Sequence, residues 1–330
     1  MSKYFIIVVM LLLTKPFLAS AQKPDTLIKK LDSLSKQPDS VGAKQKNNIN
    51  PEKYNENTKI TVNTYLILLA DDIKQQITSP FRATGSDWLK IGGFAAVTTA
   101  TALFADKPIN KAALHATATD KNVVNISTYV TNFGGLYETY TLAAFAAYGY
   151  IFKNEKTKTT TFLATQAYLT AAAIANVLKY ATGRQRPSYH DSVTMANNIF
   201  HGPFFGFKKG SSGTRPPSNS YTSFPSGHTT VAFAAATVFA MEYKNIKWVP
   251  YFAYSLASLI GASRIIQNAH WASDVITGAA LGFLCGRQVV NNYHRYSKIQ
   301  SGLQKKKKTN VTFTLNYYNS TFIPGLVYNF

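Results

Sequence analysis

Cysteine is almost absent from this chain. The 330 residues include only one, Cys285, which sits inside an apolar segment. One cysteine excludes a disulfide within the chain and excludes the thiolate clusters that hold structural zinc. The histidines of the long central loop, His190 and His201, are not spaced like metal ligands either. We therefore expect no metal site and no cofactor.

Acidic residues are also scarce. Asp and Glu number 15 against 35 Lys and Arg, which gives a formal net charge of +20. Such an excess of positive charge suits an anionic membrane surface. The basic residues follow no pattern that reads bases, so we expect no nucleic acid partner.

The apolar run at the start of the chain is short. Residues 1–21 contain Lys3, the run Tyr4–Leu13, and Ala19-Ser20-Ala21, a pattern typical of an export signal with its cleavage site. A retained signal anchor is the open alternative. Residues 22–59 are rich in Lys, Asp, Ser, Asn and Gln, which predicts a flexible linker.

Residues 60–87 are expected to form an amphipathic helical segment. Leu66, Leu68, Leu69, Ile73 and Ile77 have a spacing that fits a helix. Such a helix can lie on a membrane or against the core of the protein.

Leucine and isoleucine are sparse in the longer apolar segments, where Ala and Thr replace many of them. We expect six helices, at Trp88–Ala105, Leu136–Phe152, Thr160–Lys179, Thr229–Tyr243, Val249–Ile265 and Ala272–Val290. Each is close to the length that crosses a bilayer. Small residues, with glycine at 278, 282 and 286, allow close helix packing. The prediction is an all-α six-helix bundle that is either embedded in a membrane or soluble.

The last part of the chain, residues 291–330, has a different pattern. It begins with a basic stretch that includes Lys305–Lys308. Val311, Phe313 and Leu315 then alternate with polar residues, and a second apolar stretch follows Asn319-Ser320. This pattern predicts a basic tail and a small β-hairpin.

One short stretch, SRIIQNAHWASD at 263–274, combines groups that can do chemistry. His270 and Asp274 stand four residues apart, so on a helix they share one face. The carboxylate can then accept the Nδ1 proton and leave Nε2 as a free lone pair. Arg264, expected in a loop before the helix, could reach an anion that the imidazole attacks. A surface pair beside an unrelated arginine is the alternative.

Two further stretches favour an anion site. Lys179 and Arg186 lie in KYATGRQRP, at the end of an apolar run. Ser226, Gly227 and His228 lie in FPSGHTT, directly before another apolar run. A helix that begins there offers free backbone N–H groups to a phosphate oxygen.

Together the three stretches resemble the signature motifs of the type 2 phosphatidic acid phosphatase and vanadium haloperoxidase superfamily. The order K-x6-RP, PSGH, SR-x5-H-x3-D is complete, and the resemblance extends over about 88–290. It implies a six-helix bundle of that family's type, here the bacterial lipid phosphatase branch. Three ordered motifs are far more specific than one.

The resemblance also implies the roles of the residues. His270 would be the nucleophile, Asp274 would hold its tautomer and His228 would be the acid and base. The phosphate would be bound by Lys179, Arg186, Ser226, Gly227 and Arg264. The expected activity is metal-independent hydrolysis of a lipid phosphate monoester or pyrophosphate through a phosphohistidine. A vanadate-dependent haloperoxidase and a non-catalytic envelope protein on the same scaffold are the alternatives.

Location follows from the signal and the resemblance. We expect an exported, membrane-associated protein of the cell envelope whose site faces the periplasm. Six spans after a cleaved signal would instead place the loop after the third helix in the cytoplasm, and would leave Lys305–Lys308 outside, against the positive-inside tendency. The sequence leaves this topology open.

Overall fold

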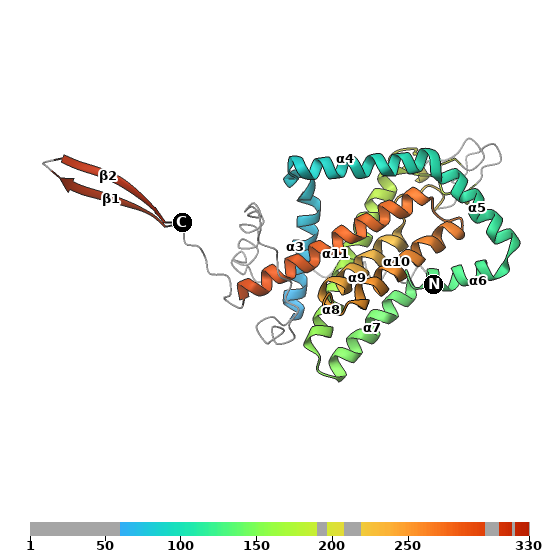
Figure 1. Ribbon diagram of the computed structural model, residues 1–330, viewed down its shortest axis with the longest axis horizontal. Coiled ribbons are helices and arrows are strands. Elements are labelled where there is room, and N and C mark those ends of the chain that lie inside the picture. The colour runs from blue at the N-terminus through green and yellow to red at the C-terminus, as the bar shows by residue number, and fades with distance from the viewer. Residues whose placement is uncertain (1–59, 190–196, 208–218, 301–309, 319–320, 330) are drawn as a thin grey trace. The chain divides into compact units, whose positions relative to one another are not determined.

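The computed structural model describes residues 60–189, 197–207, 219–300, 310–318 and 321–329 (Figure 1). The expected signal at 1–21, the expected linker at 22–59, His190 and the lysines at 305–308 lie outside the described residues. Most of the described chain is helical, which confirms the helical fold class expected from the sequence.

The described helices follow one another along the chain with short connections, except for the long connection between Thr182 and Gly227. They are α3 (Val62–Thr78), α4 (Gly85–Ala100), α5 (Asp106–Thr119), α6 (Lys121–Asn132), α7 (Leu136–Ile151), α8 (Glu155–Thr182), α9 (Gly227–Glu242), α10 (Trp248–Ile266) and α11 (Ala272–Gln300). Single turns of other helix types are η3 (Ser79–Arg82), η4 (Thr101–Ala105), a π-type segment between α4 and α5, and η5 (Phe205–Phe207).

Helix α9 is the packing centre of the bundle and contacts α8, α10 and α11 (Figure 1). Half of its residues are Ala or Thr, so neighbouring helices come close. A Cβ at Gly282 of α11 would lie 2.2 Å from the Thr230 carbonyl oxygen, and one at Gly286 would lie 2.5 Å from that of Ala234. The glycines of α11 therefore let its backbone touch the backbone of α9.

Helix α8 ends sharply at Gly183. This residue has φ 55°, a left-handed conformation that glycine adopts without strain. A Cβ there would also lie 2.2 Å from the Gly202 carbonyl oxygen. The turn leaves Lys179 in the last turn of α8 and sends the following arginines back toward the bundle.

Helices α5 and α6 lie where the sequence analysis expected none, between the first two apolar segments. Their sequences, DKPINKAALHATAT and KNVVNISTYVTN, are polar and lack a run of apolar residues. α5 continues from α4 through η4, and α6 starts at Asp120, whose side chain accepts a hydrogen bond from the Asn122 amide at 2.8 Å. A capping residue, rather than hydrophobic periodicity, marks the start of α6.

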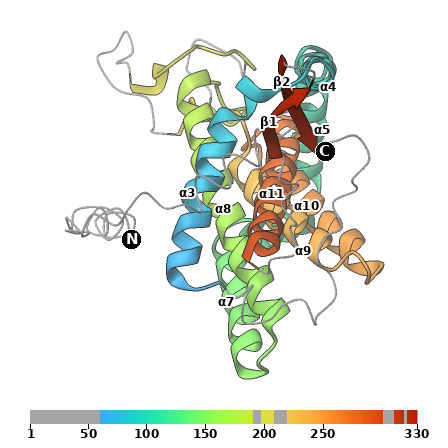
Figure 2. The ribbon, with the colours of Figure 1, turned by 90° about the vertical axis from the view of Figure 1, so that its left-hand side faces the viewer.

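Helix α3 packs against α8 and α11 (Figure 2). Most of its buried residues are polar. The Gln75 side-chain amide donates to Asn292 Oδ1 at 3.0 Å, and Asn292 donates to Asp72 Oδ1 at 2.8 Å. Ile73 and Ile77 are exposed instead. Leu68 is buried, but Leu66 lies on the exposed side with these two, so the apolar side of α3 is mostly outward, as in a helix that lies on a membrane.

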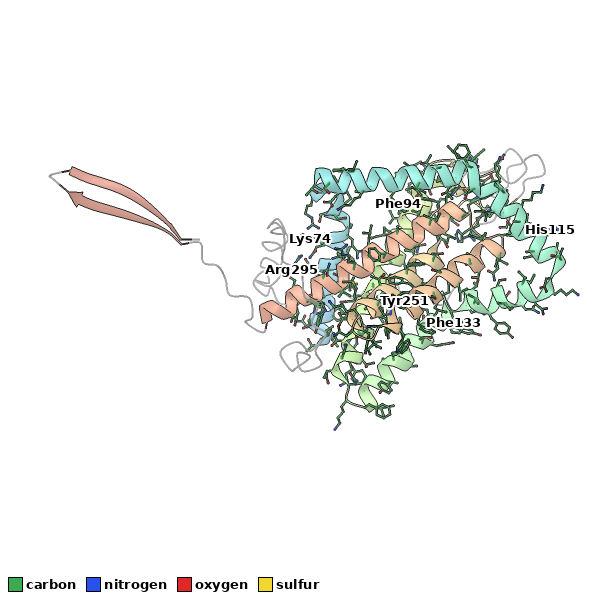
Figure 3. All side chains as sticks on the ribbon, viewed as in Figure 1. Lys74, Phe94, His115, Phe133, Tyr251 and Arg295 are labelled. Atoms are coloured by element: carbon green, nitrogen blue, oxygen red, sulfur yellow. The ribbon has the colours of Figure 1, made fainter. Side chains whose placement is uncertain are left out.

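Exposed apolar surface continues on other helices. No residue of α4 is buried, although Leu89 and Phe94 are among its large apolar side chains, and Tyr251 of α10 is 77% exposed (Figure 3). Within the described residues, three helical segments are long and apolar enough to cross a membrane: Gly85–Thr119, Glu155–Thr182 and Trp248–Ile266. A helix that is apolar on all sides without being buried suits contact with lipid.

Two strands follow the helices. β1 (Asn310–Tyr318) pairs antiparallel with β2 (Thr321–Asn329), from Asn310 opposite Asn329 to Tyr318 opposite Thr321.

Candidate active site

His270 lies in the short connection between α10 and α11. Its Nδ1 is 2.7 Å from the carbonyl oxygen of Ser223 and 3.6 Å from Asp274 Oδ2. A carbonyl oxygen only accepts, so Nδ1 carries the proton and Nε2 keeps a free lone pair. The tautomer is the expected one, but the direct acceptor is a backbone carbonyl rather than Asp274.

Asp274, in the first turn of α11, holds that carbonyl in place. Its Oδ2 accepts from Ser223 Oγ at 2.6 Å and from the Trp271 amide at 2.9 Å, while Arg184 Nη1 donates to its Oδ1. All of these groups are buried. Asp274 therefore acts on His270 largely through Ser223.

Arg184 is a residue that sequence reasoning missed. Its side chain is completely buried, and its Nη2 lies 2.6 Å from Asp106 Oδ2 at the start of α5. Ser273 joins the pair, because its amide and hydroxyl both donate to Asp106. Phe200 covers the guanidinium, with 4.6 Å from its carbon to the ring centroid. The only sequence signal was a third basic residue inside KYATGRQRP.

The three expected cations, Lys179, Arg186 and Arg264, are partly exposed and lie within electrostatic range of one another. Arg264 is in the last turn of α10 rather than in a loop, and its Nη1 donates to Gln267 Oε1 at 2.5 Å. The Nε groups of Arg186 and Arg264 are buried without a partner among the described residues. These N–H groups are available to an anion.

Helix α9 brings its N-terminus to the same place. Ser226 is the N-cap residue, but its hydroxyl accepts from Thr229 Oγ1 at 2.9 Å and makes no cap bond to the backbone. Its own amide donates to the carbonyl oxygen of Asp274 at 3.1 Å, which joins the second motif to the third. A Cβ at Gly227 would lie 2.8 Å from Lys179 Nζ, so glycine leaves room for the ammonium beside the first amides of α9.

His228 follows in the first turn of α9 and is partly exposed. Its Nε2 lies 3.4 Å from the position of a Cβ on Gly135, so the loop between α6 and α7 forms one wall of the site. Burial lowers the pKa of His228, and the nearby charges of Lys179, Arg186, Arg264 and His270 contribute to this shift. The structure therefore brings the predicted site residues together from four helix ends.

Electrostatics favour a neutral nucleophile. Burial is the main cause that lowers the pKa of His270 to about 4; the nearby charges of Arg186 and Arg264 contribute to this shift, while Asp274 opposes it. At neutral pH the imidazole is therefore uncharged and its Nε2 lone pair is free.

The remaining loop histidine lies apart from this chemistry. His201 stacks on Phe205 with ring centroids 4.3 Å apart and meets Tyr221 edge-on. Within the described residues, no group of three or more His, Cys, Asp or Glu side chains could hold a metal ion.

Comparison with known proteins agrees with the motifs. Residues 160–298 match the model of the PAP2 superfamily. A lipid A 1-phosphatase of Porphyromonas gingivalis is 51% identical over 73 residues, which are 22% of this chain and 16% of that protein. One of Rhizobium johnstonii is 33% identical over 109 residues, 33% of this chain and 38% of that protein. The chain thus spans less than half of the length of either relative.

A solved structure is also similar. The transmembrane PAP2 type phosphatidylglycerolphosphate phosphatase from Bacillus subtilis aligns with a TM-score of 0.44 and 22% identity, over 66% of this chain and 96% of that one. The residues that match the PAP2 superfamily model, 160–298, hold all three motifs.

Proposed function

We propose that this chain is a phosphatase that hydrolyses a phosphate monoester or pyrophosphate on a lipid, without a metal. One observation carries the proposal. Three cations and two imidazoles meet at one place beside the N-terminus of α9, as their mutual electrostatic effects indicate. Phosphoryl transfer needs positioning and neutralised charge, and this site offers both.

The first step forms a phosphohistidine. His270 Nε2 attacks phosphorus, the bond from phosphorus to the lipid oxygen breaks, and its electron pair stays on that oxygen. Burial and the nearby cations lower the pKa of His228 to about 3 in the free enzyme, so His228 takes up a proton when the anionic substrate neutralises those cations, and then donates it to the leaving oxygen. Lys179, Arg186, Arg264 and the amides at the start of α9 bind the other phosphate oxygens.

The second step returns the enzyme to its initial state. His228 takes a proton from water, and the water oxygen attacks phosphorus. The P–N bond breaks, its electron pair returns to Nε2, and inorganic phosphate leaves. Asp274 and Ser223 keep the Nδ1 proton in place throughout.

The placement of the site suits a lipid headgroup. Lys179 and Arg264 are in the last turns of α8 and α10, while His228 and Asp274 are in the first turns of α9 and α11. All four ends therefore meet at one face of the bundle. If α8 and α10 span the bilayer, that face lies at the membrane surface, which we place on the periplasmic side of an exported protein.

The names of the relatives suggest one candidate substrate. Because they are lipid A 1-phosphatases, a lipid A 1-phosphate is one candidate substrate. Phosphatidic acid, phosphatidylglycerol phosphate and an isoprenyl pyrophosphate are the others.

Phosphate release from these four lipids and from a soluble ester tests the proposal, with purified protein in detergent and EDTA present. We expect turnover with at least one lipid, and a labelled phosphoenzyme that disappears in His270→Ala. Lys247→Ala, which changes an exposed cation next to the other end of α10, is the control and should keep the label.

Three results would contradict the proposal. They are a label that persists in His270→Ala, complete loss of activity in EDTA that added zinc or magnesium restores, and no turnover of any ester. Bromide oxidation with added vanadate, in the absence of phosphate release, would favour a haloperoxidase.

A further inference from the structure

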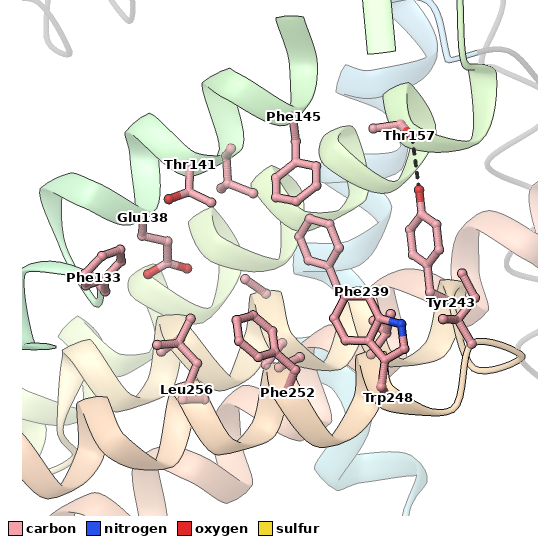
Figure 4. Close-up of a pocket in the computed structure, with 18 of the residues that line it drawn as sticks. Phe133, Glu138, Thr141, Phe145, Thr157, Phe239, Tyr243, Trp248, Phe252 and Leu256 are labelled. Carbon is pink, nitrogen blue, oxygen red and sulfur yellow. Dashed lines mark hydrogen bonds between the residues drawn. The ribbon is translucent and has the colours of Figure 1, made fainter. Parts of the chain in front are cut away.

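A deep apolar cavity lies between α7, α9 and α10 (Figure 4). Its volume is about 660 Å³. Phe133 and Ile260 line one end, Tyr243 and Trp248 line the other, and small residues of α9 such as Ala236 form the wall between them. A cavity of this size and lining is typical of a site for an apolar ligand.

One end of the cavity adjoins the catalytic groups. A Cβ on Gly134 would lie 2.5 Å from Ile260 Cγ2 and 3.2 Å from His228 Cβ, so this loop residue touches both the cavity wall and the proposed acid. His228 protonates the leaving oxygen, and in an in-line displacement that oxygen is opposite His270. The lipid is the leaving group, so it must extend from the side of His228, where the cavity begins.

The cavity also has the length of a lipid chain. From Ala232 to Tyr243, both in its lining, α9 rises about 16 Å at 1.5 Å per residue. Half of the hydrocarbon core of a bilayer is about 15 Å. The cavity therefore matches one acyl chain of one leaflet.

Glu138 is the unusual residue of this cavity. Its carboxyl points into the space between α7 and α10 (Figure 4), it is 7% exposed, and neither oxygen has a hydrogen-bond partner among the described residues. Other polar groups of the lining are paired: Thr141 Oγ1 donates to a backbone carbonyl, and the hydroxyls of Thr157 and Tyr243 are 3.1 Å apart. An unpaired buried carboxyl is costly unless a ligand satisfies it.

The position of Glu138 indicates which part of a ligand it would meet. It follows Gly135, which lies against His228, by three residues, or about 4.5 Å along the helix. This distance places the carboxyl near the head of a bound chain rather than near its end. Burial favours the neutral form of this carboxyl, which both donates and accepts a hydrogen bond. Polar groups close to the head of a lipid are esters, amides and hydroxyls; an ester only accepts, whereas an amide or hydroxyl both donates and accepts.

We propose that the cavity binds an acyl chain of the leaving lipid, and that Glu138 accepts a hydrogen bond from an amide or hydroxyl near the head of that chain. The inference rests on the proposed function and specifies its substrate class. Lipids with an N-acyl or hydroxylated chain should then be preferred over lipids with esters alone, because an ester can accept from the Glu138 O–H but leaves the accepting oxygen of the buried carboxyl without a donor.

The test compares ceramide 1-phosphate, which has an amide and a hydroxyl near its phosphate, with phosphatidic acid, which has esters. We expect Glu138→Leu to lower the ratio of kcat/KM for the two lipids about tenfold, the size of one lost hydrogen bond to a buried group. Glu138→Gln keeps an acceptor and should retain most of the ratio. Leu169→Phe, on the exposed surface of α8, is the control and should leave the ratio unchanged. An unchanged ratio in Glu138→Leu would overturn the assignment.

Chain binding has its own variant. Ala236→Phe fills the middle of the cavity, so it should lower turnover of long-chain phosphatidic acid more than that of a short-chain form. An equal effect on both would place the acyl chain elsewhere.

A binding measurement separates this inference from the proposed function. Ceramide, the dephosphorylated lipid, should raise the Tm of the wild-type protein in detergent more than diacylglycerol does. Glu138→Leu should abolish that difference. If the wild type shows the difference but hydrolyses no ester, the cavity assignment stands and the catalytic proposal fails. If the two lipids stabilise the wild type equally, the cavity assignment fails whatever the activity.

Discussion

At the scale of residues, the candidate site has two kinds of cation: those partly exposed to solvent and one that is buried in a structural network. Lys179, Arg186 and Arg264 are partly exposed, and we propose that they bind the phosphate, whereas Arg184 is buried between two carboxylates. The buried guanidinium neutralises Asp274 in part and fixes the hydroxyl of Ser273 at 2.7 Å. The nucleophile is thus oriented by groups that no substrate reaches.

Arg184→Met should lower the free energy of unfolding by about 3–5 kcal/mol, because Asp106 and Asp274 would remain buried without their cation. A denaturant titration in detergent measures it. The control, Lys90→Met, removes a cation 3.7 Å from Asp87 in an exposed pair and should change stability by less than about 0.5 kcal/mol. Equal effects would mean that the buried network contributes little.

The pH dependence of kcat/KM should report His270 in the free enzyme. Below its pKa of about 4 the imidazole is protonated and cannot attack, so activity should fall as the pH drops through that value. Arg186→Gln removes a charge that lowers this pKa, so the acid limb should move to higher pH and kcat/KM should fall about 10²–10³-fold. Lys247→Gln is the control. An acid limb that stays in place in Arg186→Gln would assign it to another group.

At the scale of elements, the contact between α9 and α11 sets the geometry of the site. The glycines of α11 bring the two backbones together, and the Ser226 amide reaches the Asp274 carbonyl at the end of the same contact. The close packing of α9 against α11 therefore also aligns the second motif with the third.

Gly282→Ala should destabilise the protein by about 1–3 kcal/mol and lower kcat, because its Cβ would lie 2.2 Å from the Thr230 carbonyl oxygen and 2.9 Å from the Ala234 amide, and backbone atoms cannot move aside cheaply. Gly92→Ala on α4 is the matched control, since nothing lies within 4 Å of its Cβ. That substitution should stabilise the protein by about 0.5–1 kcal/mol. Thermal unfolding of both variants in detergent decides, and the same sign for both would contradict the packing argument.

At the scale of the whole molecule, the sequence predicted the helical fold and a group of polar residues that the structure brings together, because three ordered motifs that adjoin long apolar runs constrain both. It could not predict that Arg184 is buried while Arg186 is partly exposed, since both are arginines and only two positions apart. Nor could it predict that the Ser223 carbonyl oxygen is the partner of His270, because every residue has a backbone carbonyl and the sequence does not indicate which one is used. Helices α5 and α6 were missed because their residues are polar.

The hydrogen bond from the Ser226 amide to the Asp274 carbonyl has a consequence for redesign. It connects the start of α9, proposed to bind the anion, to the start of α11, next to the proposed nucleophile His270. A change in the backbone of one should therefore alter the other. Adapting the proposed anion site to a larger oxyanion would require coordinated changes in both helix starts. The effects of paired substitutions there on kcat/KM should differ from the sum of the effects of the single substitutions.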